Sequence, residues 1–527
     1  MILTPASKHP RNQTVMNPVK DFRMNPFATS ERGLLKALVI STIPIALFLR
    51  YLWSLSLGNG DELFFSTAAG TFDIGQGTWA QWSDFFYWLW WEHTGRTADW
   101  ISGAIYLLGD GVGRWLASIL ATLSAGIITW CLYRLSKYFG LAPTPPAIAV
   151  PVSLLTLLFS YSAAGLTPLV NLTFYSAAVA NYFVPGALIF AVLTMAMVSN
   201  KTSTLYLASI IGSITATMHE QAAIILLVLV ILLVVADPQR RPLQHRLISS
   251  LIVLAGVVEM FLSPGLHAKL TRVAAAQPEV VTSVPHKILI TFYTFGAYYS
   301  IMGLLTSALV VAYLVAYICQ SRQTVSSWIL IVVLGISTTV WLTGIRQLGI
   351  ESPFSSHTLN GLACIVMVIT WLITPLISNS NAVRFGSVLL IAAGGSLAIP
   401  AAAGLSAVRV LNFPIIFLMG FQLWTMHLGV HAATTSSFNK MNVKQFLTSA
   451  AIPTALLVLS MLAIINTTIA FEANSKPGLE DLTKQDIACS QARCPAQDPQ
   501  IPYPKAFAGY GNHDYASTRS VLEWLGQ

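Results

Sequence analysis

The chain has 527 residues, of which 55% are hydrophobic and only 9% are charged, and its mean hydropathy is +0.66. Because charged residues make up roughly a quarter of a soluble domain, this composition excludes a water-soluble globular protein. Apolar runs such as 34–57, 222–236 and 451–470 approach or exceed the roughly 20 residues that a helix needs to cross a hydrocarbon core. The sequence therefore predicts an all-α, polytopic transmembrane helical bundle.

Three regions follow one another along the chain. The polar residues 1–33 predict a disordered cytoplasmic leader, because the apolar run after them is too long for a signal peptide. Residues 34–470 predict a transmembrane domain of about 11–13 spans, and residues 471–527 predict a polar extracytoplasmic tail. Apolar runs begin near residues 34, 113, 146, 183, 204, 222, 247, 289, 326, 357, 385, 412 and 446.

Residues 58–110, between the first two predicted spans, are dense in Trp and Phe, most of all over residues 79–91. Indole and phenol rings favour the headgroup level of a membrane. We therefore expect interfacial helices in this long first extracytoplasmic loop.

Basic residues between the spans set the predicted orientation. With the N-terminus in the cytoplasm, six of them lie in outer loops, namely Arg96, Lys269, Arg272, Lys287, Arg346 and Arg409. Fifteen lie in inner segments, namely Lys8, Arg11, Lys20, Arg23, Arg32, Arg134, Lys137, Lys201, Arg240, Arg241, Arg246, Arg322, Arg384, Lys440 and Lys444. This bias is typical of cytoplasmic loops and predicts a multi-pass protein of the cell (inner) membrane. It also accounts for the net charge of +8 without a nucleic-acid partner.

The cysteines agree with this topology. Cys131, Cys319 and Cys364 occur singly in or beside spans, where a thiol acts as a small apolar side chain. Cys489 and Cys494 lie in the tail, where either a disulfide on an oxidising outer face or two free thiols fits the sequence.

Asp61 and Glu62 directly follow the first span, beside apolar residues at the membrane surface. Burial and a neighbouring like charge both raise the pKa of a carboxyl group. A raised pKa suits a general base that takes a proton from a sugar hydroxyl, so we predict that this pair is catalytic. The alternative is a helix N-terminus whose acidic residues complement the helix dipole.

Two further polar segments lie at predicted outer ends of spans. Arg96 stands in a loop that is poor in positive charge, where it pairs with Asp61, with Asp99 or with a ligand phosphate, or forms an ordinary interfacial salt bridge. Asn181 and Tyr182 precede Pro185 where the chain re-enters the membrane, and they either orient a substrate or cap the helix.

His219 and Glu220 interrupt the apolar stretch 205–236, at the tip of a tight helical hairpin. Polar groups in such a place are costly unless they face protein or water, and a plain turn favours Gly, Asn or Ser. The pair therefore indicates a function: metal ligands, contacts to an acceptor, or hydrogen-bond partners of each other. Arg50 and Glu259, near the outer ends of their spans, either reach the interface or pair with each other.

Cations just above the outer membrane surface run against the positive-inside tendency. Lys269 and Arg272 follow Ser263-Pro264-Gly265, and Arg346 has the same setting at a later span. Such cations suit a phosphate group at headgroup depth, although each is also a plausible contact for a lipid headgroup.

In order and topology these segments resemble the GT-C superfamily of membrane glycosyltransferases, and most closely the bacterial families related to serotype-converting glucosyltransferases. The resemblance covers about the first half of the chain, where no single motif is specific. The residues after Ser263-Pro264-Gly265 are Leu266 and His267, where the family pattern has a polar Asn. The segments that carry the resemblance are Asp61-Glu62, Thr94-Gly95-Arg96, Asn181-Tyr182, His219-Glu220-Gln221, and Ser263-Pro264-Gly265 with Arg272.

The resemblance implies a polyprenyl-phosphate sugar donor and a glycan or lipid acceptor on the extracytoplasmic side. By this analogy Asp61 is the base, Glu62 is its partner or a contact to metal or acceptor, and the arginines at 96, 272 and 346 contact phosphate or loops. No cofactor is identified, and the sequence leaves open whether a divalent metal takes part. A single displacement would invert the anomeric centre.

The main alternative is a multi-pass transporter or flippase of a lipid-linked or small polar substrate. Transporters place polar residues mid-membrane on broken helices, often in two matching halves. In this sequence the polar residues cluster at the predicted outer ends of the spans, and we see no matching halves. The sequence therefore favours the enzyme, an inverting glycosyltransferase of GT-C type.

Overall fold

The computed structural model of the chain describes residues 26–55, 79–141, 144–159, 173, 176–237, 239–276, 284–298, 300–320, 324–346, 356–378, 380–397, 400–401, 411–435 and 451–469. In these ranges the ordered elements are helices, and no strand occurs among them. The prediction of an all-α bundle is confirmed. Asp61, Glu62, Cys489 and Cys494 lie outside the described residues.

The helices of the first half of the chain are α1 (Pro26–Leu55), α3 (Trp79–Trp88), α4 (Ala98–Leu107), α5 (Arg114–Tyr138), α6 (Pro146–Leu158), α8 (Ser176–Ala178), α9 (Val184–Val198), α10 (Thr202–Met218), α11 (Glu220–Ala236), α12 (Leu243–Leu262) and α13 (Pro264–Ala276). Those of the second half are α14 (Val284–Tyr298), α15 (Ser300–Gln320), α16 (Thr324–Arg346), α17 (Ser356–Leu376), α18 (Asn381–Ser396), α20 (Asn412–Thr435) and a last helix over Ala451–Ile469. Short π-helical turns at Leu89–His93 (η2), Gly109–Gly113 (η3) and Val179–Phe183 (η5) adjoin α3, α5 and α9.

Seven of the described helices are long and apolar enough to cross a membrane, and four shorter helices are also apolar. The seven spans are Glu31–Ser54, Gly111–Tyr138, Val179–Val198, Leu243–Leu262, Thr358–Leu376, Asn412–His431 and Ala451–Ile469. The protein is therefore a multi-pass, all-helical membrane protein. The buried free thiols of Cys131 and Cys364 agree with their predicted role as small apolar side chains.

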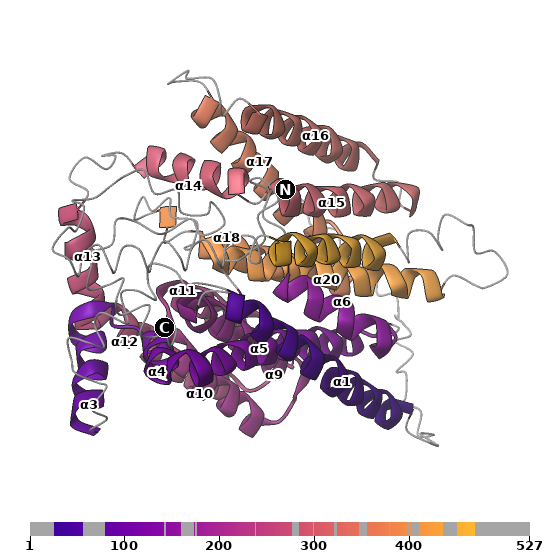
Figure 1. Cartoon of the computed structure of the whole chain (residues 1–527). Coiled ribbons are helices and arrows are strands. Elements are labelled where there is room, and N and C mark those ends of the chain that lie inside the picture. Colours follow the sequence, from indigo (N-terminus) through magenta and orange to yellow (C-terminus); the bar gives the residue numbers. More distant parts are fainter. Residues whose placement is uncertain are drawn as a thin grey trace, which may run out of the picture.

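The spans differ in how far other helices enclose them. In the apolar part of α20, 78% of the residues are buried, whereas the figure for α1 is 11%. Accordingly α20 packs against α18, α15, α5 and α6 near the centre of the bundle, while α1 contacts mainly α5 and α6 (Figure 1). The enclosed helix carries fully buried Trp424 and Phe413, so large aromatic side chains fill the middle of the bundle.

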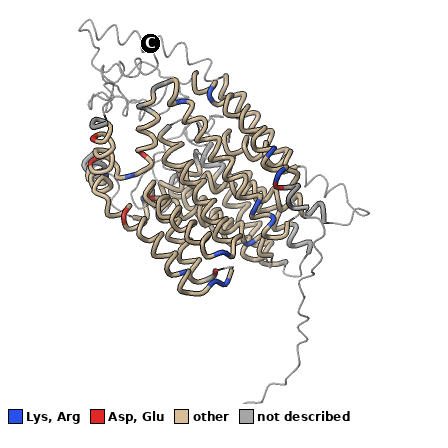
Figure 2. Tube along the Cα trace, turned by 90° about the horizontal axis from the view of Figure 1, so that it is seen from below, with Lys and Arg blue, Asp and Glu red and all other residues tan. Residues whose placement is uncertain are grey.

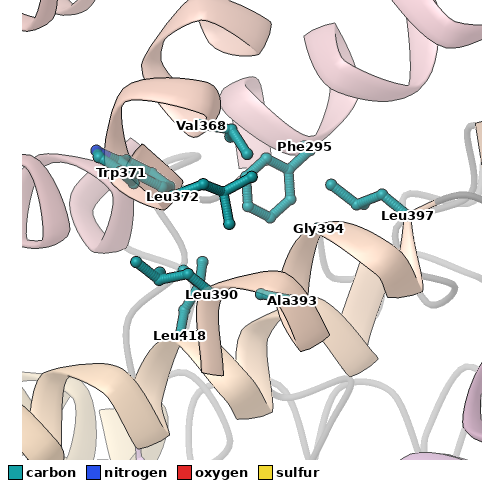
Figure 3. A pocket seen from close by; sticks show the side chains of 9 residues that line it. All are labelled: Phe295, Val368, Trp371, Leu372, Leu390, Ala393, Gly394, Leu397 and Leu418. Atoms are coloured by element: carbon teal, nitrogen blue, oxygen red, sulfur yellow. The ribbon is translucent and has the colours of Figure 1, made fainter. Parts of the chain in front are cut away.

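A small pocket between α14, α17, α18 and α20 is lined by apolar side chains. The pocket has a volume of about 10 Å³ and is lined by the nine residues in Figure 3. This volume is about the minimum that admits one water molecule, and no charged group faces it. This pocket therefore serves packing.

The sequence predicted one span starting near residue 289, and α14 and α15 lie in this region, with residue 299 between them outside the described residues. Two glycines, one on each of these helices, face the same fully buried indole of Trp341 on α16. A Cβ atom at Gly296 would lie 2.3 Å from Trp341 Nε1, and one at Gly303 would lie 2.9 Å from Trp341 Cη2. The two glycines leave room for the indole against both helices, a packing relation that the apolar pattern does not reveal.

The helices α3 and α13 run across one end of the bundle rather than along it, at the left of Figure 1. The turn η2, which continues α3, packs against α13. Most of the described Asp and Glu positions lie toward this end of the molecule and most Lys and Arg positions lie toward the other (Figure 2). The first loop thus contains helices, as predicted, and they cover the end of the bundle where acidic residues gather.

Close contact between α10 and α12 holds the helices of this region together. A Cβ atom at Gly256 of α12 would lie 2.1 Å from the carbonyl oxygen of Ser213 in α10. Small residues let helix backbones approach closely inside membranes, where packing replaces the hydrophobic effect as the driving force. Gly256 therefore fixes the spacing between α10 and α12.

We predict that Gly256→Ala lowers the free energy of unfolding by about 2 kcal/mol, because the added methyl group forces α10 and α12 apart. Gly126→Ala on α5 is the matched control, since no atom lies within 4 Å of a Cβ placed there. Thermal unfolding of both variants in lipid nanodiscs measures the difference. Equal midpoints for the two variants would contradict the packing role of Gly256.

Candidate functional site

Two glycine-containing segments meet backbone to backbone at the end of the bundle that α3 and α13 cover. Gly95 has a φ of +65°, which favours glycine, and its Cβ would lie 2.2 Å from Ser263 Oγ. In turn, a Cβ at Gly265 would lie 2.3 Å from the backbone nitrogen of Gly95. Both glycines are thus required by the contact, which brings the loop after η2 against the start of α13.

This contact brings three charged side chains from distant segments together. Arg96 Nη2 lies 2.9 Å from Glu220 Oε1 and 2.7 Å from Glu220 Oε2, and Lys269 Nζ lies 2.9 Å from Glu220 Oε1. The side chains of Arg96 and Glu220 are 12% and 6% exposed, whereas that of Lys269 is 23% exposed. We call these three residues the ion cluster. Its least enclosed member is a cation.

Two cations in the ion cluster share a single carboxylate. Burial lowers the pKa of the Lys269 ammonium below its ordinary value, and the charge of Arg96 lowers it further, whereas Glu220 raises it. Asp99 also raises the pKa of Lys269, so the site as a whole holds two cations and two carboxylates. The side chain of Lys269 is the most exposed member of the ion cluster, and phosphate oxygens accept hydrogen bonds from an ammonium group. Arg272 lies three residues after Lys269 on α13, a spacing that places the two on the same helix face.

A second carboxylate, that of Asp99 at the start of α4, is buried next to the ion cluster and held by neutral donors. The hydroxyl of Thr94 donates to Asp99 Oδ2, and Asn181 Nδ2 donates to Asp99 Oδ1 at 2.8 Å. Asn181 lies in η5 and also donates to the carbonyl of Ala177 at 2.9 Å. It therefore joins η5 to α4, and it does not cap α9, whose N-terminus has no side-chain cap.

His219 is the single residue between α10 and α11, and its backbone is extended (φ −160°, ψ 143°). Its Nδ1 accepts a hydrogen bond of 3.1 Å from the backbone N–H of Gln221, so His219 caps α11. The imidazole packs against the rings of Tyr182 and Phe413, with centroid distances of 4.9 and 5.6 Å. The capping residue of α11 is thus also part of an aromatic wall.

The contacts of His219 determine its protonation state. Burial lowers the pKa of the imidazole well below its ordinary value, and the charge of Arg96 lowers it further. The ring is therefore neutral near pH 7, and since Nδ1 accepts a hydrogen bond, Nε2 carries the proton. His219 Nδ1 also lies 3.4 Å from Glu220 Oε2, and the roles predicted for this pair stay predictions.

Six of the residues predicted to bind substrate or phosphate lie in or against this site: Arg96, Asn181, Tyr182, His219, Glu220 and Lys269. Arg272 lies on α13 and Arg346 is the last residue of α16. For these two arginines the structure describes the backbone. The catalytic assignment of Asp61 and Glu62 concerns residues outside the described ranges and stays a prediction.

Arg96 pairs with Glu220, a partner that the sequence analysis did not consider. The sequence also allowed Arg50 and Glu259 to pair, but the guanidinium of Arg50 lies 5.9 Å from the ring centroid of Trp115. Glu259 instead lines a groove between α10 and α12. Sequence reasoning missed Phe413, because nothing in the pattern of α20 distinguishes it from other apolar residues.

Two further observations bear on the identity of the site. Within the described residues, no group of three or more His, Cys, Asp or Glu side chains is placed to hold a metal ion. No protein-family model, curated protein or solved structure matches this chain.

We predict that Glu220→Gln destabilises the protein by about 3 kcal/mol, because it leaves two cations enclosed without their carboxylate. The exposed residue Asp84 on α3 provides the matched control Asp84→Asn, which should change stability little. Thermal unfolding in nanodiscs compares the two. If unpaired cations cause the loss, the double variant Glu220→Gln/Lys269→Gln is more stable than Glu220→Gln alone. A double variant that is less stable would contradict this explanation.

Proposed function

We propose that this protein is an inverting membrane glycosyltransferase that transfers a sugar from a polyprenyl-phosphate donor to a glycan or lipid acceptor on the extracytoplasmic side. The observation that supports the proposal best is the ion cluster, in which Arg96 and Lys269 share Glu220 at one end of the helices. A lipid-linked donor presents its phosphate at the membrane surface, where such a cluster can receive it.

The proposed orientation rests on the basic residues at the two ends of the helices. The ion cluster lies where α10 and α12 end and where α11 begins, and the other ends of these helices carry Lys201, Arg241 and Arg246. Because cytoplasmic ends carry the excess of Lys and Arg, the ion cluster belongs on the extracytoplasmic side. The N-terminus is then cytoplasmic, the tail is extracytoplasmic, and the protein resides in the cell (inner) membrane.

The reaction is a single displacement at the anomeric carbon. The acceptor hydroxyl loses its proton to the carboxylate of Asp61 as its oxygen bonds to the anomeric carbon. The bond from that carbon to the phosphate oxygen breaks, and the phosphate leaves with the electron pair. Lys269, with Arg272 on the same face of α13, stabilises the negative charge of the departing polyprenyl phosphate.

The more deeply buried residues act as positioning residues in this proposal. Glu220 holds Arg96 and Lys269 in place, and Asn181 fixes Asp99 beneath the loop that carries Arg96. His219 and Tyr182 form the aromatic wall behind Glu220. A buried carboxylate that already accepts from two cations is better suited to orienting them than to taking a proton.

The ion cluster also separates this proposal from the alternative of a transporter or flippase. Transport sites lie near the middle of the membrane, on interrupted helices that expose backbone groups to substrate. In this structure the charged groups of the ion cluster gather at helix ends. The arrangement favours chemistry at the membrane surface.

We predict that Asp61→Asn abolishes sugar transfer, because the amide cannot accept the proton of the acceptor hydroxyl. Asp73→Asn in the same loop is the control and retains activity. The assay follows release of polyprenyl phosphate from a panel of polyprenyl-phosphate sugars by purified protein in lipid, with crude surface glycan as acceptor. Full activity of Asp61→Asn would assign the base to another residue. A wild type that consumes no donor would reject the proposed function.

The lowered pKa of Lys269 predicts a pH dependence. The ammonium loses its proton at a lower pH than an ordinary lysine, so activity falls as the pH rises through that pKa. Lys269→Arg keeps its charge and moves this fall to higher pH, whereas Lys269→Gln lowers kcat/KM about 100-fold below the pKa of Lys269 and removes the fall. Rate profiles from pH 6 to 10 test this, and an unchanged alkaline fall in Lys269→Arg would exclude Lys269 as its cause.

A further inference from the structure

A groove on the side of the molecule adjoins the ion cluster. It has a volume of about 470 Å³ and lies between the first loop on one side and α10 and α12 on the other. This volume is typical of sites for small ligands. The residues that line it are Trp90, Thr97, Trp100, Ser213, Thr217, Ala255, Gly256 and Glu259.

The side chains of the groove combine aromatic faces with hydrogen-bonding groups. The indoles of Trp90 and Trp100 meet edge to face, with centroids 6.0 Å apart, and Trp100 is 40% exposed. Hydroxyl groups come from Thr97, Thr217 and Ser213. An indole face can cover the C–H face of a sugar ring, while hydroxyl groups bond to its edge.

Glu259 is the one charged residue of the groove, and its surroundings make it unusual. It is exposed on α12 beside the exposed apolar side chains of Val258 and Leu262. A carboxylate on an apolar, membrane-facing helix is costly unless it has a polar partner. A carboxylate accepts hydrogen bonds and donates none, so sugar hydroxyl groups are fitting partners.

The groove and the ion cluster share a wall. Thr97 directly follows Arg96, its backbone N–H donates to the carbonyl of Thr217 at 3.0 Å, and the two hydroxyl groups lie 3.0 Å apart. Thr217 in turn stands two residues before His219. A molecule in the groove therefore lies next to a group held by Arg96.

The groove opens toward the surface that faces the lipid. The side chains of Ile210 and Ile214 on α10, like those of Val258 and Leu262 on α12, are exposed and apolar. A ligand anchored in the bilayer by its own lipid chain reaches the groove by lateral diffusion and needs no path through water.

We propose that this groove binds the hexopyranose ring of the lipid-linked donor, stacked on Trp100 and hydrogen-bonded to Glu259. The inference rests on the proposed function and extends it, because it assigns the donor sugar to the groove and the donor phosphate to the ion cluster. Sugar selectivity then resides in Glu259 and the neighbouring hydroxyl groups.

Photolabelling tests the groove without requiring turnover. The full chain in nanodiscs is exposed to alkyl glucoside, galactoside and mannoside probes with a diazirine next to the sugar, and to an alkyl phosphocholine with the same diazirine. We expect at least one glycoside to label the groove residues of α10 or α12, mapped by mass spectrometry. Labelling should fall about tenfold in Trp100→Leu and Glu259→Gln, the effect of losing one contact of about 1.4 kcal/mol.

Two matched variants control for nonspecific effects of removing a tryptophan or a carboxylate. Trp328→Leu removes an exposed tryptophan of α16, and Asp84→Asn removes an exposed carboxylate of α3; both should be labelled like the wild type. Equal labelling by the phosphocholine probe would overturn the inference, because the groove would then be a site for ordinary lipid. Labelling that is indifferent to Trp100→Leu and Glu259→Gln would also overturn it.

Kinetics then distinguish the donor from the acceptor. In the transfer assay, Glu259→Gln should raise KM for the polyprenyl-phosphate sugar about tenfold and leave KM for the acceptor unchanged. A rise in the acceptor KM alone would overturn the assignment to the donor. Sugar-dependent labelling in a wild type that turns over no donor would reject the proposed function but retain a sugar-binding groove.

Discussion

The site depends on one interaction, the sharing of the Glu220 carboxylate between Arg96 and Lys269. Enclosed charges are costly unless they are paired, so each member requires the others. Glu220 begins α11, Arg96 belongs to the first loop and Lys269 to α13. The charges therefore hold the loop, the bundle and the crossing helix in one arrangement, in which the least covered member is the Lys269 ammonium.

Glycine contacts make that interaction geometrically possible. Gly95 and Gly265 let two backbones touch, and Gly256 lets α12 approach α10. In a membrane, close approach of this kind gives packing energy that the hydrophobic effect does not supply between apolar helices. The polar site and the apolar bundle are thus not independent, because the same close contacts that pack the helices also set the separation between Arg96 and its carboxylate.

The sequence predicted the helical class and most span positions, because the length of an apolar run is a local property. It also singled out His219 and Glu220 as candidate site residues, because polar residues that interrupt an apolar stretch can be recognised from the sequence alone. It did not predict the pairing of Arg96 with Glu220, which depends on how two segments 124 residues apart meet through Gly95 and Gly265. The packing of Gly296 and Gly303 against Trp341 was missed for a similar reason, because the indole comes from another helix.

In the proposed function, phosphate binding and sugar recognition occupy adjoining places, and this has a physical consequence for selectivity. Attraction between the ion cluster and an anion is strong but largely insensitive to what the anion carries, so it cannot by itself discriminate among polyprenyl-phosphate sugars. Discrimination requires neutral, directional contacts, and on the adjoining surface these are offered by the hydroxyl groups, the indoles and Glu259 of the groove. Because Thr97 and Thr217 join the two places by hydrogen bonds, the proposed function implies that a sugar that fits the groove poorly also displaces its phosphate from the cations. Recognition of the sugar is in this way coupled to stabilisation of the leaving group, although the two tasks fall to different residues.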